Sequence, residues 1–296
     1  MPTIKANGVS LEYREAGTGE PVVLVHGGIS DYRIWQGQRE ALGRSYRAIS
    51  YSCRYHWPNA PASPDAEQSV DEHVEDLIAL VAELDAAPAH LVGNSFGGLL
   101  CLLAAMRAPE VVRSLVLVEA FALPLLLPMP PSPLDLVKLA LHHPRTAAVV
   151  AHFGARGLGP TQAAFERGDL EKGLQIFTNA VLGRWGVEQM TEARLEQAHD
   201  NLETFASQLT RGTFPSTHTA DMGAITAPTL LLTGAQSPSM MGLLTDRVHD
   251  FMPTAERVEI PAASHDAHVD NPSAVTDAIL AFLADRTNSD RSASPT

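Results

Sequence analysis

The sequence predicts an α/β fold in which a mostly parallel, doubly wound sheet carries an inserted segment of helices. Three observations support this fold class. Short apolar runs that suit strands covered on both faces alternate with helical segments. A G-x-S-x-G pentapeptide at residues 93–97 lies between one such run and a helix. A long stretch, residues 121–220, has helical patterns and no run typical of a buried strand. The chain of 296 residues, 45% of them hydrophobic, is long enough to bury a sizeable core.

The expected core comprises residues 1–120 and 221–285. Its strands are predicted at residues 9–15, 21–25, 46–51, 89–92, 112–118, 228–234 and 257–261. A capping box at residues 69–72 should open a helix that ends near residue 85. A closing amphipathic helix is expected at residues 274–283. The polar residues 286–296 are predicted to be a disordered tail.

Residues 121–220 are expected to form a helical cap, or lid, over the strand ends. After a proline-rich start, three helices are predicted at about residues 134–153, 161–182 and 187–210. Leucines of this segment, together with five large aromatic residues, could line an apolar cleft or simply pack the cap: Phe153, Phe165, Phe177, Trp185 and Phe205.

Ser95 is the predicted nucleophile, at the corner between a strand and the next helix. Gly93 and Gly97 leave room for a tight turn that exposes the hydroxyl. The amide of Phe96, at the helix start, would face the negative charge that gathers on an attacked carbonyl. The pentapeptide alone also describes ordinary loops, so the prediction depends on its neighbours.

The loop His26-Gly27-Gly28 follows another predicted buried strand. Its small residues let the backbone approach a ligand, and an amide of this loop could be a second donor facing the serine. The alternative is a flexible glycine turn. The functional interpretation is favoured because the ends of neighbouring parallel strands meet at one edge of the sheet.

Composition excludes several classes of function. A formal net charge of −13 argues against nucleic-acid and anionic-membrane partners. The two cysteines, Cys53 and Cys101, do not make a disulfide framework. We expect no signal peptide, no membrane span and a cytoplasmic location. The sequence leaves open whether the chain forms a homodimer.

Together, the HGG loop, the serine corner, the helical insert and a late histidine make the chain resemble the α/β-hydrolase family over residues 9–283. Trp35 matches a tryptophan often found shortly after the HG loop. The resemblance implies a Ser–acid–His triad, an oxyanion hole formed by the amides of Gly28 and Phe96, and no cofactor or metal.

The resemblance assigns the triad histidine to His265, which follows a predicted strand and a small-residue loop. His268, three residues on, is the competitor and is expected to be a solvated loop residue. A metal site built from His265, His268 and Asp270 lacks further ligands and is disfavoured.

The triad acid departs from the commoner family pattern, because residues 234–241 contain no carboxylate. Some haloalkane dehalogenases and the zearalenone-lactone hydrolases carry the acid instead at the end of the strand after the elbow helix. Glu119 occupies that position here, at the end of an otherwise apolar strand where an acidic side chain needs a partner. Asp246 is the alternative acid, in a longer loop.

The predicted activity is hydrolysis of a carboxylic ester or lactone through an acyl-enzyme, with a small hydrophobic substrate. The same triad would also serve a carbon–carbon bond hydrolase, an amidase or a perhydrolase. A hydrolase-like protein that only binds a small molecule is the alternative outside catalysis.

Overall fold

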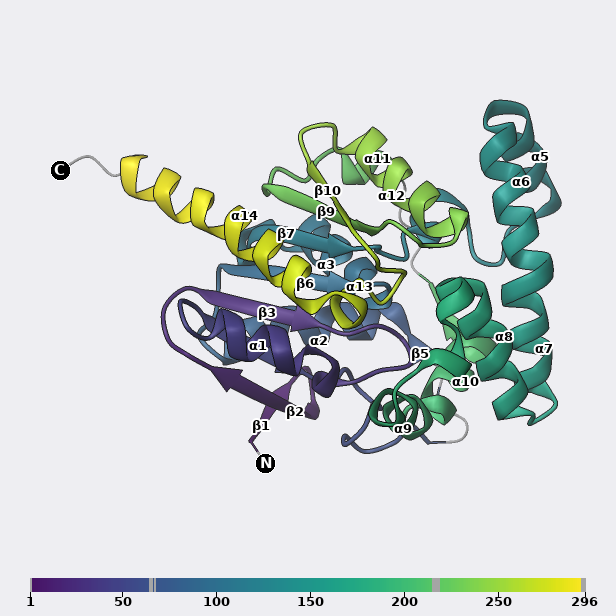
Figure 1. The fold of residues 1–296 in the computed structure, drawn as a ribbon, viewed down its shortest axis with the longest axis horizontal. Helices are drawn as coiled ribbons and strands as arrows, with labels where there is room; N and C mark the ends of the chain where they lie inside the picture. Colours follow the sequence, from purple (N-terminus) through teal and green to yellow (C-terminus); the bar gives the residue numbers. More distant parts are fainter. Residues whose placement is uncertain (1, 64–65, 67, 215–218, 294–296) are drawn as a thin grey trace.

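The structure is a computed structural model that describes residues 2–63, 66, 68–214 and 219–293. Its core is an eight-stranded sheet with the strand order β1-β2-β4-β3-β6-β7-β9-β10 (Figure 1). The strands are β1 (Thr3–Ala6), β2 (Val9–Ala16), β3 (Pro21–Val25), β4 (Arg47–Tyr51), β6 (Ala89–Asn94), β7 (Val112–Val118), β9 (Thr229–Gly234) and β10 (Glu256–Ile260). Strands β1 and β2 pair antiparallel, as do β2 and β4, and all the other pairs of this sheet are parallel. The predicted mostly parallel α/β fold is confirmed.

Helices cover both faces of the sheet, and the side chains of each strand alternate between them. In β3, Val23 and Val25 join the core under α2 (Val70–Glu83) and α3 (Phe96–Arg107). Val22 and Leu24 of the same strand point to the opposite core. That second core is covered by α1 (Gln36–Leu42), α13 (Ala267–Asp270) and α14 (Pro272–Ala293). A strand buried on both faces therefore reads as one continuous apolar run, as the sequence predicted.

The strand order reverses between β3 and β6. The chain passes from β3 to the neighbouring β4, then crosses over β3 to β6, which pairs with β3 on its other side. At such a switch point the loops that follow the two strands diverge and leave a crevice at their carboxyl ends. Here those loops are the HGG loop after β3 and the Ser95 corner after β6.

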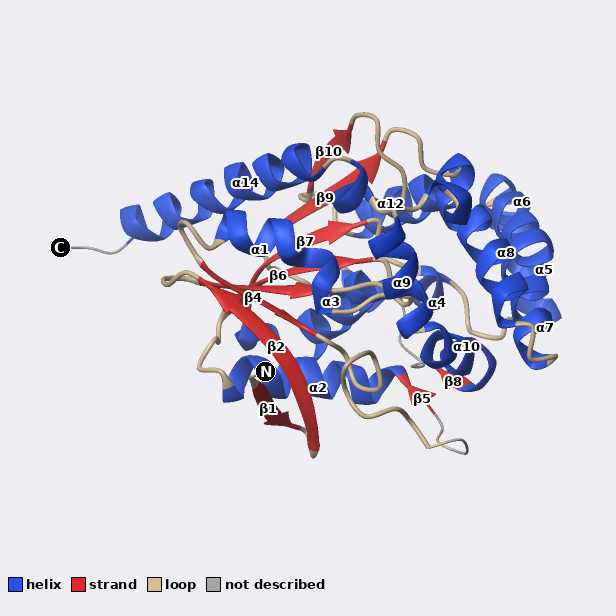
Figure 2. Ribbon diagram, turned by 60° about the horizontal axis from the view of Figure 1, so that its bottom comes forward, coloured by secondary structure: helices blue, strands red, loops and turns tan. Residues whose placement is uncertain are grey.

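The segment between β7 and β9 is helical and gathers beyond the carboxyl ends of the parallel strands (Figure 2). It contains α4 (Leu123–Leu126), α5 (Pro133–His142), α6 (Pro144–Phe153), α7 (Gly159–Glu166), α8 (Leu170–Leu182), α9 (Glu192–Asp200), α10 (Leu202–Arg211) and α11 (Thr219–Met222). A short parallel pair, β5 (Gln68–Ser69) with β8 (Gly212–Thr213), links it to the loop before α2.

Each of the three long helices predicted in this segment is two helices. The first breaks at His143, because the residue before a proline is disfavoured in helical conformation. The second breaks near Gly168, whose φ of +77° is left-handed. The third breaks at Asn201, which has a non-helical φ of −111° and ψ of 2° and whose side chain bonds Asp31 and the Trp57 amide.

Two further predictions were wrong. Ser69 caps α2 by accepting from the amide of Asp71, but Glu72 does not complete the capping box, because its carboxylate lies 2.9 Å from Nη1 of Arg54. The tail expected to be disordered from residue 286 instead continues α14 to Ala293, while residues 294–296 lie outside the described part of the chain. Within the described ranges, no helix combines the length and apolar character needed to cross a membrane.

Replacing a core leucine of α3 tests this packing. Leu99 is fully buried, so Leu99→Ala should lower the free energy of unfolding by about 2–5 kcal/mol in urea denaturation. Leu141→Ala, at a side chain that is 76% exposed, is the matched control and should change stability by less than about 0.5 kcal/mol. Equal effects of the two substitutions would contradict the described core.

Candidate active site

Ser95 lies at the turn that joins β6 to α3. Its φ of +50° and ψ of −114° are unusual for a residue with a side chain, and such backbone strain occurs mainly at functional sites. The turn is held from both sides by the end of β7. The Ser95 amide donates to the carbonyl of Val118 at 3.1 Å, and the Phe121 amide donates to the carbonyl of Ser95 at 2.9 Å. The sheet therefore stabilises a conformation that the residue alone would avoid.

Glycine at position 97 is required by the close approach of β3. A Cβ atom built on Gly97 would lie 2.3 Å from the carbonyl oxygen of Val25 and 2.6 Å from that of His26. Because both are backbone atoms, no side-chain movement could relieve the contact. The first turn of α3 is thus packed directly against the strand that leads into the HGG loop.

Glu119 is buried at the end of β7, with 1% of its surface exposed. Its Oε2 lies 2.8 Å from Nδ1 of His265. Its Oε1 accepts from the Gly234 amide at 2.8 Å and from the hydroxyl of Ser237. The stretch that carries the acid in the commoner family pattern thus supplies hydrogen-bond donors to an acid placed elsewhere.

His265 is held in one tautomer and one position. Because Glu119 accepts from Nδ1, the proton lies on Nδ1 and Nε2 is left as the basic nitrogen. The Asn94 amide group donates to the His265 carbonyl at 3.1 Å. Burial lowers the pKa of His265, but the hydrogen bond and negative charge of Glu119, with the charges of Asp266 and Asp270, outweigh it and raise the pKa above its ordinary value.

The alternatives weighed from the sequence lie elsewhere. Asp246 lies within α12 (Ser239–Phe251), is 57% exposed at its side chain and pairs with Arg257 at 2.7 Å.

His268, the alternative histidine, is not a solvated loop residue, since it is 2% exposed and stacks on Trp35 with ring centroids 4.2 Å apart. Burial lowers its pKa to about 4. In the described part of the chain, no three His, Cys, Asp or Glu side chains gather as a metal site, so His265, His268 and Asp270 do not form one.

Two buried histidines support the HGG loop. His26 accepts from the Cys53 amide at Nε2, 2.9 Å, which leaves Nδ1–H to donate to the Gly27 carbonyl at 2.7 Å. Burial, together with the neighbouring His56, lowers the pKa of His26 to about 3, so the ring is neutral. His56 Nε2 lies 3.0 Å from the carbonyl of Gly28. The carbonyl groups of both glycines of the HGG loop, which would hold the second amide donor, are therefore contacted by buried histidine rings.

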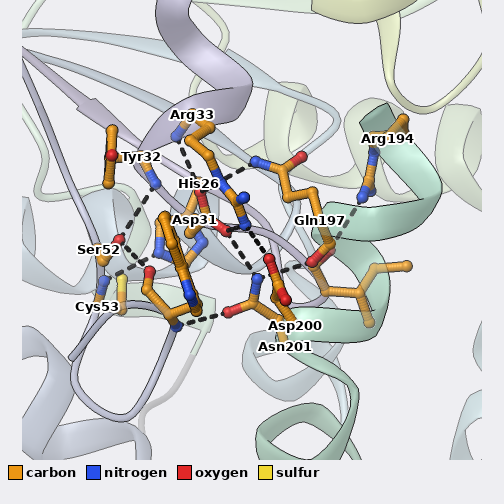
Figure 3. A network of polar contacts seen from close by, with 12 residues as sticks. His26, Asp31, Tyr32, Arg33, Ser52, Cys53, Arg194, Gln197, Asp200 and Asn201 are labelled. Carbon is orange, nitrogen blue, oxygen red and sulfur yellow. Dashed lines mark hydrogen bonds and ion pairs between the residues drawn. The ribbon is translucent and has the colours of Figure 1, made fainter. Parts of the chain in front are cut away.

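The residues after the HGG loop anchor α9 to the core (Figure 3). The fully buried carboxylate of Asp31 accepts from the guanidinium of Arg33 and from the side-chain amides of Gln197 and Asn201. Burial raises the pKa of Asp31, but these hydrogen bonds outweigh it and lower the pKa below its ordinary value. Helix α9 is thus fixed to the loop beside Gly28.

Arg194 links the two halves of the site. Its Nη1 donates to the Ile29 carbonyl at 3.0 Å, next to Gly28. Its Nη2 donates to Asp266 at 3.1 Å, next to His265. One side chain of the helical segment therefore spans the two loops that follow β3 and β10.

One cavity brings four of the five predicted site residues together, and the fifth, Glu119, lies behind His265. Gly28, Ser95, Phe96 and His265 all line it, and it encloses about 1020 Å³ of space not filled by protein atoms, open mouth included. As the first residue of α3, Phe96 has an amide with no partner within the helix.

Most of the remaining cavity wall is apolar. It is formed by large side chains of the helical segment and of the residues next to it: Phe121, Phe153, Leu158, Phe177, Val181, Leu182, Phe205 and Leu209. Of the aromatic residues expected to line a cleft, Phe165 and Trp185 pack within the helices instead.

Sequence reasoning missed several supporting residues: Ser237, Asn94, Asp31 and Arg194. Each acts on a partner far away in the chain, so no local pattern marked it. The one available signal was the absence of a carboxylate from residues 234–241, which pointed to the acid at Glu119 but not to the donors that hold it.

Comparison with known proteins agrees with this architecture. A family model described as the alpha/beta hydrolase fold matches residues 20–272. The chain is 28% identical over 274 residues to a mouse (Mus musculus) sn-1-specific diacylglycerol lipase, which covers 89% of this chain and 80% of the lipase. The chain belongs to the α/β-hydrolase fold family.

Two solved structures share the fold at low sequence identity. A thermophilic esterase from Thermogutta terrifontis superposes with a TM-score of 0.68 at 20% identity, covering 97% of this chain and 99% of the esterase. An N-acyl homoserine lactone degrading enzyme, Est816, also has a TM-score of 0.68 at 20% identity, covering 95% of this chain and 100% of that enzyme.

Substitution of Gly97 tests the close approach at the Ser95 corner. Gly97→Ala should distort the corner and lower both folding stability and any activity that depends on Ser95, because its Cβ would overlap two backbone carbonyls. Gly37→Ala, in helix α1 with open space around the new Cβ, is the control and should stabilise the protein by about 0.5–1 kcal/mol. Thermal unfolding of both variants checks this, and a Gly97→Ala protein as stable as the wild type would contradict it.

Proposed function

We propose that the protein is a serine hydrolase that cleaves a carboxylic ester or lactone through an acyl-enzyme. The observation that carries this proposal is the hydrogen bond from the buried Glu119 to His265, which lines the same cavity as the strained Ser95. A nucleophile, an oriented base and a buried acid are the parts that acyl transfer needs. Glu119 thus takes the acid role that Asp246 would have in a more usual arrangement.

The proposed reaction assigns a task to each residue. Ser95 Oγ attacks the substrate carbonyl while Nε2 of His265 takes its proton and then returns it to the leaving alcohol. Glu119 orients the imidazole and stabilises its charged form. The amides of Gly28 and Phe96 bind the oxyanion, where one donor typically contributes about 2.7–4 kcal/mol. Water then hydrolyses the acyl-enzyme through the same histidine.

The cavity supports a small hydrophobic substrate, because its wall is mostly apolar. The similar proteins support the same chemistry, since they include a diacylglycerol lipase, an esterase and an enzyme that degrades an N-acyl homoserine lactone.

Matched variants test the proposed triad. Wild type should hydrolyse p-nitrophenyl acetate, butyrate or octanoate, and Ser95→Ala should lose about 10⁶-fold in kcat. Glu119→Gln should lose about 10²- to 10⁴-fold, because the histidine loses its charged partner. Asp246→Asn, at the exposed alternative, should keep wild-type activity.

The same panel gives the contradicting outcomes. If Asp246→Asn abolishes activity and Glu119→Gln does not, the acid assignment is wrong. If wild type is no better than Ser95→Ala on every ester and on a lactone panel, the hydrolytic proposal itself is wrong.

The raised pKa of His265 predicts the pH profile. Since the neutral ring acts as base, kcat/KM should rise with pH through an apparent pKa above the ordinary histidine value of about 6.5. In Glu119→Gln the loss of negative charge should move this limb to lower pH while the plateau falls. An unshifted limb in Glu119→Gln would show that the carboxylate does not act on His265.

The stability of the fold should depend on pH in the opposite direction. The contribution of the charged Glu119–His265 pair to the free energy of unfolding is fully present below about pH 6.5 and is lost as pH rises through the folded-state pKa of His265.

A further inference from the structure

A second group of polar side chains lines the cavity and has no part in the proposed triad. Gln68 comes from β5, His73 from the first turn of α2 and Gln208 from α10. These three elements contact one another beside the short sheet formed by β5 and β8. Distant parts of the chain thus bring three polar side chains to one wall of an otherwise apolar cavity.

Two of these side chains are buried without the partners they require. Gln68 is 2% exposed, and neither its amide nitrogen nor its amide oxygen has a hydrogen-bond partner among the described residues. His73 is also 2% exposed, and its Nδ1 likewise lacks a partner there. Its Nε2 lies 3.5 Å from Nε2 of Gln208, the upper limit of a hydrogen bond. Buried polar groups are nearly always paired, so these atoms indicate a ligand group that the described residues do not supply.

The three side chains carry no charge. Burial, together with the nearby His56, Arg54 and His26, holds the pKa of His73 well below its ordinary value, so the ring is neutral. Arg194 also lines the cavity, but its guanidinium is already engaged by Asp266 and by the Ile29 carbonyl. Among the described residues that line the cavity, an ionised group would therefore find no free countercharge beside Gln68, whereas a neutral donor or acceptor would find both kinds of partner.

An aromatic ring separates this polar wall from the nucleophile. The His73 ring packs edge-on against the ring of Phe96, with centroids 5.3 Å apart, and Phe96 directly follows Ser95. Val70 and Phe214 line the cavity beside the polar group. A substrate that reaches both places needs an apolar stretch between its reacting carbonyl and its second polar group.

We propose that Gln68, His73 and Gln208 form a second subsite that binds an uncharged hydrogen-bonding group of the substrate, such as a hydroxyl, carbonyl or ether oxygen. An apolar spacer joins that group to the scissile carbonyl. This inference rests on the proposed ester or lactone hydrolysis at Ser95, and it names the substrate class: a hydrophobic ester with a neutral polar group remote from the carbonyl.

Matched ester pairs test the subsite. The substrates are p-nitrophenyl hexanoate, octanoate and decanoate, each compared with its ω-hydroxy counterpart. In wild type, kcat/KM for at least one hydroxy ester should exceed that of its unsubstituted partner by about 3- to 10-fold. Gln68→Leu and Gln208→Leu should bring this ratio to one or below, because the hydroxyl then enters an apolar wall. Gln36→Leu, on the exposed surface of α1, is the matched control and should keep the wild-type ratio.

Binding to Ser95→Ala separates failure of the subsite from failure of the proposed hydrolysis. Calorimetry with the same ester pairs needs no turnover and should show the same preference for the hydroxy ester, lost on adding Gln68→Leu. If this preference appears but wild type cleaves no ester, the subsite stands and the proposed hydrolysis fails. The subsite is wrong if wild type has the same kcat/KM for both esters of every pair and Gln68→Leu leaves the ratio of every pair unchanged.

Thermal unfolding gives an independent readout. A Gln68 amide kept for a ligand is unpaired in the free protein, so Gln68→Leu should leave the melting temperature unchanged or raise it by about 2 °C or more. A clear fall in melting temperature would show that the amide serves the fold and would overturn the proposal.

Discussion

The site depends on one buried carboxylate that needs more hydrogen bonds than its own strand can provide. A glutamate carboxylate buried at the end of an apolar strand is unfavourable unless both of its oxygens find donors. Glu119 meets this requirement with an amide and a hydroxyl from the loop after β9 and with the imidazole of His265. The hydrogen bonds to the Glu119 carboxylate therefore hold the ends of β7, β9 and β10 together. One of these bonds also orients the imidazole of His265.

The helical segment contributes to the order of the site as well as covering it. Asp31 ties α9 to the loop beyond the two glycines, and Arg194 spans from that loop to the residue after His265. Both links are buried and use a charged group. Breaking the Arg194–Asp266 pair would leave a buried charge without its partner, and losing Gln197 and Asn201 would remove two donors from the Asp31 carboxylate. Movements of α9 are consequently coupled to the geometry of the two loops that face Ser95.

Much of the fold could be predicted from the sequence, because strands buried on both faces appear as unbroken apolar runs. Ser95 and His265 could be named from local patterns, and Glu119 from the missing carboxylate at residues 234–241. Helix ends were harder, since breaks such as the one at Asn201 depend on contacts with the core. The expectation for His268 was wrong because its burial against Trp35 is a tertiary contact that leaves no local signature.

The way Glu119 is held also bears on how the family could vary the position of its acid. The loop after β9 donates two hydrogen bonds to Oε1 of Glu119, while Oε2 of the same carboxylate contacts Nδ1 of His265, so this loop lies one carboxylate away from the imidazole. A chain that gained an acidic residue near Ser237 while keeping Glu119 would hold two carboxylates around one imidazole, and repulsion would leave one of them protonated. Either acid could then be lost without leaving the histidine unsupported. A change from one position of the acid to the other therefore need not pass through a protein whose histidine has no carboxylate partner.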